Sequence, residues 1–149
     1  MKKRIKLPVQ FEMVHYAEQP SFKMSFSSEA IRDWCLGLSL LKEGLVESLV
    51  IEPTGGKLKL ELQGAPPGTE GRIPGNLKNE TVSLKLTPVD VDYLLVFSLK
   101  YYRDGYAKVD HIDLQSAFED LGDDIYVTLK FADVAPPMSS EAAKKLLGH

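Results

Sequence analysis

The sequence predicts a single α+β domain in which a mostly antiparallel sheet packs two main helices on one face. Three features of the 149 residues predict this class: segments that alternate apolar and polar residues, two segments with apolar residues at helical spacing, and a similar order of these segments in the two halves of the chain. A content of 44% hydrophobic and 26% charged residues is typical of a folded domain, and the length suits one domain.

The predicted strands alternate apolar and polar residues, which is typical of a sheet with one buried face and one wet face. In the first strand Ile5, Leu7 and Val9 share one face, whereas Lys6 and Gln10 share the other. The sequence Pro-Thr-Gly-Gly-Lys before the third strand predicts a hairpin turn. The segments with this alternation are 5–13, 22–26, 57–62, 81–86 and 125–131.

The first helix is predicted from about Ser28 to Glu43. Ser27 or Ser28 is a suitable N-cap, and Gly44 is suited to end the helix. Charged residues fall on the face opposite the apolar stripe, as in a helix that lies on a core. The apolar residues at helical spacing are Ala30, Ile31, Trp34, Cys35, Leu38 and Leu41.

The second helix is predicted over residues 88–104. Thr87 is a natural N-cap, Pro88 fits the first helical position, Asp90 suits a capping box, and Gly105 closes the helix. The same stretch also fits the first arm of a long hairpin. Asp-Gly favours a two-residue turn, and the residues on both sides of it are rich in β-formers.

An internal repetition favours the helix over the hairpin. Both halves, at about 4–63 and 80–132, contain an alternating strand, a Ser or Thr cap, an apolar run, a glycine and a new strand. This repetition predicts a duplicated strand–helix–strand plan. The Gly- and Pro-rich residues 64–79 between the halves are expected to be a connector. A short Ser-capped helix is expected at the C-terminal end.

Composition and charge argue against several classes of partner. A net charge of −3 is unfavourable for nucleic acid, whose phosphates need clustered Lys and Arg, and the basic residues 2–6 are expected to be solvated. No apolar run approaches the roughly 18 residues of a membrane helix, so we expect no membrane partner. Cys35 is the only cysteine, which excludes an intramolecular disulfide and a thiolate metal site and favours the cytoplasm.

A histidine stands between two aspartates in Lys-Val-Asp-His-Ile-Asp-Leu, on a predicted strand. Alternation places His111 and Asp113 on one face and Asp110 on the other. A metal site needs three or more protein ligands, and the other histidines are His15 and His149. We therefore expect no metal, no cofactor and no catalytic residue, with His111 at the rim of the sheet.

The second helix has more apolar residues than one buried stripe needs. Apolar or aromatic side chains lie almost all the way round it between Tyr93 and Tyr102, so its far side must be covered. Its end, with Tyr101, Tyr102, Arg103 and Tyr106, has the composition of a binding hot spot. The far side of the helix is covered either by the rest of this domain, such as the terminal helix, or by a partner. For the second case we expect another protein, either a different chain or a second copy in a homodimer.

These patterns favour a small cytosolic protein-binding module without catalytic activity. Acidic single-domain bacterial proteins that neutralise a toxin, as immunity proteins do, or that escort a secreted partner as chaperones have this profile. This comparison is an analogy at the level of fold class. The alternative is a small enzyme or ligand-binding protein with its site around His111 and Asp113.

Overall fold

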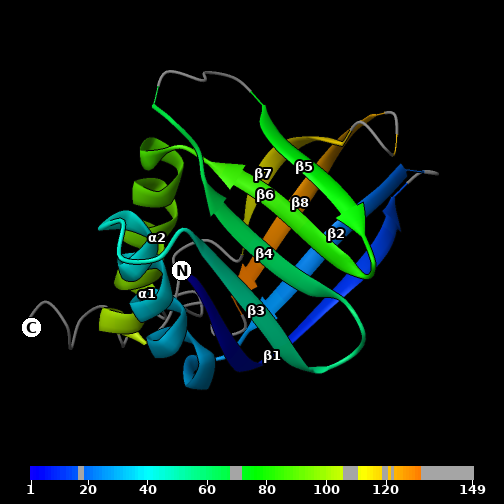
Figure 1. Ribbon diagram of the computed structural model, residues 1–149. Coiled ribbons are helices and arrows are strands. Elements are labelled where there is room, and N and C mark those ends of the chain that lie inside the picture. The colour runs from blue at the N-terminus through cyan, green and yellow to red at the C-terminus, as the bar shows by residue number, and fades with distance from the viewer. Residues whose placement is uncertain (17–18, 68–71, 106–110, 119–120, 122, 132–149) are drawn as a thin grey trace, which may run out of the picture.

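The computed structural model describes residues 1–16, 19–67, 72–105, 111–118, 121 and 123–131, which form eight strands and two helices (Figure 1). The strands close into a barrel in the order β1-β2-β8-β7-β5-β6-β4-β3. The predicted α+β class is therefore confirmed. The elements are β1 (Lys2–Tyr16), β2 (Gln19–Phe26), α1 (Ser28–Lys42), β3 (Ser48–Gly55), β4 (Lys59–Gly64), β5 (Ile73–Lys78), β6 (Thr81–Leu86), α2 (Pro88–Asp104), β7 (His111–Phe118) and β8 (Asp123–Phe131).

The barrel mixes antiparallel and parallel pairs in equal measure. Four hairpins are antiparallel: β1–β2, β3–β4, β5–β6 and β7–β8. The contacts between hairpins are parallel: β1–β3, β2–β8, β4–β6 and β5–β7. The expectation of a mostly antiparallel sheet is therefore met by half of the pairs. The alternation of apolar and polar residues does not distinguish parallel from antiparallel pairing. A closed barrel has one buried and one wet face whichever way its strands run.

The two halves of the chain have the same order of elements. The first is β1-β2-α1-β3-β4, and the second is β5-β6-α2-β7-β8. Exchanging the halves maps the strand order of the barrel onto itself, so the barrel has a pseudo-twofold arrangement. Each half thus contributes two strands before its helix and two after it, where the sequence predicted a strand–helix–strand plan.

Strand β5 lies within the residues that were expected to be a connector. Ile73 is buried, and Ile73–Lys78 pairs with both β6 and β7. Residues 64–79 therefore include a strand, and the second half begins at β5 instead of at residue 80. The sequence did not predict this strand because it contains Pro74 and Gly75, and both residue types are uncommon within strands.

Gly75 is required by the packing inside the barrel. A Cβ atom at this position would lie 2.7 Å from Cε1 of Phe118 and 3.1 Å from Cδ2 of Leu84, both of which are buried. We predict that Gly75→Ala lowers the free energy of unfolding by about 1–3 kcal/mol, the usual cost of overpacking. Urea denaturation measures this change in the free energy of unfolding.

The control is Gly55→Ala near the end of β3, because a Cβ at Gly55 has no atom within 4 Å. Its effect should stay within about 0.5 kcal/mol. Equal stability of the two variants would contradict the packing argument.

Both predicted helices are confirmed, and the rival hairpin for residues 88–104 is wrong. The side chain of Thr87 accepts a hydrogen bond from the backbone N–H of Asp90 (3.3 Å), and the Asp90 carboxylate accepts one from the N–H of Thr87 (2.9 Å). Gly105 ends α2 with a left-handed φ of 76°, a conformation that glycine adopts without strain. The predicted C-terminal helix lies outside the described residues.

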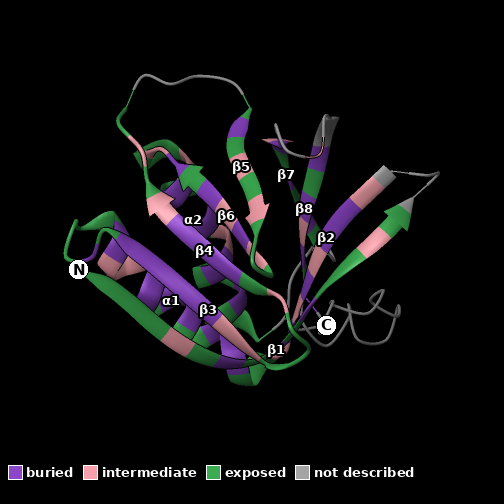
Figure 2. Cartoon of the chain, turned by 45° about the vertical axis from the view of Figure 1, so that its right-hand side comes forward, coloured by how far each residue is buried: buried purple, intermediate pink, exposed green. Residues whose placement is uncertain are grey.

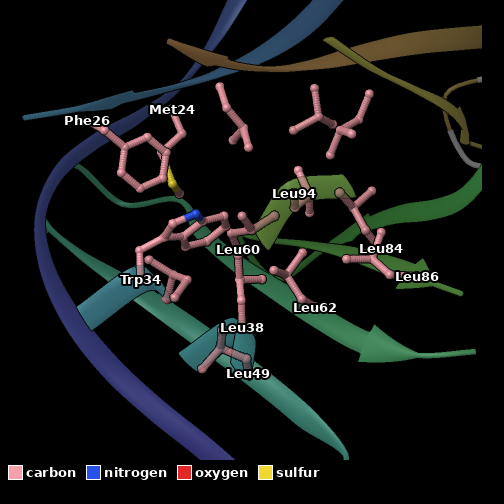
Figure 3. Packing of buried hydrophobic residues seen from close by; sticks show 14 of the residues in the cluster. Met24, Phe26, Trp34, Leu38, Leu49, Leu60, Leu62, Leu84, Leu86 and Leu94 are labelled. Atoms are coloured by element: carbon pink, nitrogen blue, oxygen red, sulfur yellow. The ribbon is translucent and has the colours of Figure 1, made fainter. Parts of the chain in front are cut away.

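The core lies inside the barrel and beneath the two helices, which contact each other (Figure 1). Buried residues alternate with less buried ones along β6 and β7, whereas β3 and β4 carry continuous buried runs (Figure 2). Trp34 of α1 and Leu94 of α2 reach the same core as Leu60 and Leu84 of the strands (Figure 3). A buried hydrogen bond of 2.9 Å from Trp34 Nε1 to Oγ of Ser98 joins the two helices.

Candidate functional site

One surface of α2 carries large apolar side chains that the barrel does not cover. Val89, Tyr93 and Val96 are 76%, 55% and 53% exposed. Their spacing of four and three residues places them in one line along the helix. Leu99 is also exposed and lies beside this line. Tyr102 is exposed as well, but it lies on the opposite side of the helix near its end. We name Val89, Tyr93, Val96 and Leu99 the α2 outer face.

The pseudo-twofold arrangement allows α1 to serve as a reference for α2. When the two N-caps, Ser27 and Thr87, are aligned, buried positions of one helix match buried positions of the other. The two helices therefore meet the barrel with equivalent faces. The matched buried pairs are Ile31 with Val91, Trp34 with Leu94, Cys35 with Leu95, Leu38 with Ser98, and Leu41 with Tyr101.

The exposed positions match in the same way, and at two of them the chemistry differs, whereas Val96 and its equivalent Leu36 are both apolar. Val89 and Tyr93 of α2 correspond to Glu29 and Asp33 of α1, and all four residues are exposed. The fold is thus compatible with charged residues at these positions. The apolar residues on α2 therefore need an explanation other than the stability of the barrel.

The structure separates the tyrosines that the sequence grouped together. Tyr101 is 1% exposed and packs 4.9 Å from the ring of Phe131, whereas Tyr102 is 52% exposed. Tyr101 is therefore a core residue and is unavailable to a partner. Arg103 is exposed and forms an ion pair of 2.7 Å with Asp104, and Tyr106 lies outside the described residues.

The sequence reasoning missed Val89 and did not single out Tyr93 and Val96. An apolar run does not show which of its members face the core. The alignment of Ser27 with Thr87 was a usable signal, because it places Val89 and Tyr93 opposite charged residues of the first helix.

Charged groups lie at one side and at one end of the α2 outer face. Nζ of Lys42 on α1 lies 2.7 Å from Oδ1 of Asp92 on α2, and this hydrogen bond raises the pKa of Lys42. Lys100 is exposed and continues the apolar line one turn after Val96, and none of the ion pairs among the described residues involves it. Polar groups next to an apolar surface are typical of protein interfaces.

The alternative site is a polar pair on the outside of the barrel. Nε2 of His111 lies 3.6 Å from Oδ2 of Asp113, and both side chains are nearly half exposed. The hydroxyl of Thr128 on β8 donates a hydrogen bond to Oδ1 of Asp113. Among the described residues no three His, Cys, Asp or Glu side chains come together to hold a metal.

His15 does not approach His111. Lys130, the register partner of His111, is also in register with Ser25 on β2. His15 is in register with Pro20, near the other end of β2. At the usual rise of a strand, Pro20 lies about 16 Å from Ser25 along β2. Two of the candidate metal ligands are therefore far apart.

Two further titratable groups have structural explanations. Cys35 lies against the core on α1, where burial raises its pKa to about 11 and keeps the thiol protonated. The side chain of Glu61 on β4 points to the outside of the barrel, where its neighbours bury it. Burial raises its pKa, but hydrogen bonds from Lys2, Gln63 and Ser83 outweigh this effect and lower the pKa overall. These bonds tie β1, β4 and β6 together.

No protein-family model matches this chain, and no curated protein sequence matches it. Neither described helix has the length and the apolar character that would let it cross a membrane.

Proposed function

We propose that this protein is a small protein-binding module without catalytic activity, and that the α2 outer face binds the partner. The observation that carries the proposal is the difference between Val89 and Tyr93 on α2 and Glu29 and Asp33 at the equivalent exposed positions of α1. Large apolar side chains that a fold does not need, surrounded by polar groups, are typical of binding surfaces.

The composition of this face favours a protein as the partner. Tyr93 presents a partly exposed ring, and tyrosine is enriched where an interface needs both an apolar surface and a hydrogen-bonding group. The helix has 17 residues and so presents about 25 Å of surface. That length suits an apolar patch on a folded partner. A toxin to be neutralised and a client to be escorted are the two kinds of partner that we propose, by analogy.

The enzymatic alternative has weaker support. His111 and Asp113 are exposed on the convex outside of β7. Catalysis by such a pair needs further groups that converge on a substrate in a pocket. We therefore rank the binding function first.

The test transfers the surface of α1 to α2. We predict that the double variant Val89→Glu/Tyr93→Asp reduces recovery of the partner at least about tenfold, because apolar anchors are replaced by charges. Its melting temperature should stay close to that of the unmodified chain, because α1 carries the same two charged residues at equivalent exposed positions. Affinity capture from the native host, quantified by mass spectrometry, measures recovery, and thermal melts measure stability.

The matched control is Glu29→Gln/Asp33→Asn, which alters the equivalent positions of α1 and should leave recovery unchanged. A homodimer is recognised by a melting temperature that rises with protein concentration and by loss of that dependence in the α2 double variant. If no protein, a second copy included, is retained by the unmodified chain in preference to the α2 variant, the proposed function is wrong.

A further inference from the structure

A second surface, separate from the α2 outer face, is a groove between α1 and β1 with a volume of about 590 Å³. Its floor is apolar and is formed by Ile5 of β1, Leu36 and Leu40 of α1, and Leu45 in the turn that follows. Leu36 and Leu45 are 54% and 65% exposed. A volume of this size is within the range of ligand sites in proteins.

The groove exists because of two features that only the first half has. Gly37 lines it, and a Cβ atom there would lie 2.8 Å from Cδ1 of Ile5, so the helix approaches β1 closely. The equivalent residue of α2 is Phe97, whose ring packs 5.4 Å from that of Phe131. In addition, β1 extends back to Lys2 and forms the second wall, whereas β5 begins only at Ile73.

Both walls of the groove carry charged side chains. Lys3 lies on the same face of β1 as Ile5, and Asp33 and Glu43 lie on the α1 wall. None of the ion pairs among the described residues involves these three side chains, although Glu43 is near enough to Lys42 to contribute to the raised pKa of that amine. The α1 wall spans roughly 15 Å between its two carboxylates, at about 1.5 Å for each helical residue.

We propose that this groove binds a short amphipathic helix from a partner protein. An apolar ridge on the ligand helix covers Leu36, Leu40 and Leu45. Acidic residues on one flank of the ridge pair with Lys3, and basic residues on the other flank pair with Asp33 and Glu43. Insertion of an amphipathic helix into an apolar groove is a recurrent mode of peptide recognition.

The charge on both walls decides between this ligand and an anionic amphiphile. A fatty acid has one carboxylate, which pairs with Lys3 and gives the carboxylates of the α1 wall no cation. A helix with opposite charges on its two flanks satisfies both walls. The inference does not depend on the proposed function, because no residue of the α2 outer face lines this groove.

The test uses a phage-displayed library of random peptides of about 16 residues, long enough to cover the groove as a helix. The full chain is the bait, and the variant Leu36→Glu removes peptides that bind elsewhere. We expect enriched peptides to have an apolar ridge with acidic residues on one flank and basic residues on the other. Their circular dichroism should become more helical on binding. In fluorescence anisotropy, Leu36→Glu should lower the affinity for an enriched peptide at least about tenfold.

The matched control is Tyr126→Glu, because Tyr126 on β8 is a large apolar residue that is 49% exposed and belongs neither to the groove nor to the α2 outer face. It should leave the affinity for the peptide within about twofold, whereas Lys3→Glu should weaken it. If Leu36→Glu does not fold, Leu45→Glu provides the same test from the turn.

Three results would overturn the proposal. The first is a library in which no peptide is enriched on the unmodified chain over the Leu36→Glu variant. The second is saturable binding of a fluorescent long-chain carboxylate that Leu36→Glu abolishes, with no peptide enriched. The third is a dimer of the unmodified chain that Leu36→Glu dissociates, which would assign the groove to a second copy.

Discussion

Replacing Tyr101 with Ala is expected to lower the free energy of unfolding by about 3–5 kcal/mol, the range for aromatic truncations in protein cores. The ring is almost completely buried and packs 4.9 Å from that of Phe131, which in turn contacts Phe26 and Phe97. Removal of the ring leaves a cavity that this aromatic cluster, held between α2, β8 and β2, fills only in part. Chemical denaturation followed by circular dichroism measures the loss.

The neighbouring residue provides the control. Tyr102 is the same residue type on the same helix but is about half exposed, so Tyr102→Ala should change stability by less than about 1 kcal/mol. If Tyr102→Ala destabilises the protein as much as Tyr101→Ala does, the boundary between core and surface assigned to α2 is wrong.

Trp34 is the site of the second large effect. It is the largest of the fully buried side chains, its ring lies 4.9 Å from that of Phe26, and its indole N–H donates to the hydroxyl of Ser98. We predict that Trp34→Ala lowers the free energy of unfolding by roughly 3–5 kcal/mol, because a large cavity forms and a buried hydroxyl loses its partner. Urea denaturation monitored by circular dichroism measures this loss.

The pseudo-twofold arrangement supplies a sharper version of this test. The positions equivalent to Trp34 and Ser98 are Leu94 and Leu38, which are both buried. Trp34→Leu/Ser98→Leu nearly conserves the total volume and removes both polar groups together. It should be more stable than Trp34→Leu alone by at least about 1 kcal/mol, and a double-mutant cycle measures the coupling. Additive effects of the two substitutions would show that the pair is not coupled.

The helices could be predicted from the sequence because their signals are local. Thr87, Pro88 and Asp90 identify the start of α2, and Gly105 identifies its end. Closure of the barrel could not be predicted, because it depends on parallel pairing between residues far apart in the chain. Strand β5 was missed because Pro74 and Gly75, which suit an outward-facing position and the space beside Phe118, resemble loop residues in the sequence.

The candidate site remains a prediction. The excess of apolar residues in the sequence of α2 drew attention to this helix, and several of those side chains are exposed. The prediction placed the surface at its tyrosine-rich end, because tyrosine is common at interfaces, yet the ring of Tyr101 is part of the core. Which side of a helix faces the barrel depends on how it packs against its neighbours, and composition alone does not contain that information. The groove beside Gly37 also depends on tertiary packing, namely the approach of α1 to β1.

The parallel pairs between the two halves have a consequence for how the chain folds. Phe22 of β2 pairs with Val127 of β8, and Leu62 of β4 pairs with Leu84 of β6. Neither half can therefore satisfy its own strand edges. During synthesis, β2 must wait for β8 to leave the ribosome, and until then its edge is open to other chains. Such long-range pairing favours slow folding, and it makes the two halves a single cooperative unit in which damage to either one unfolds both.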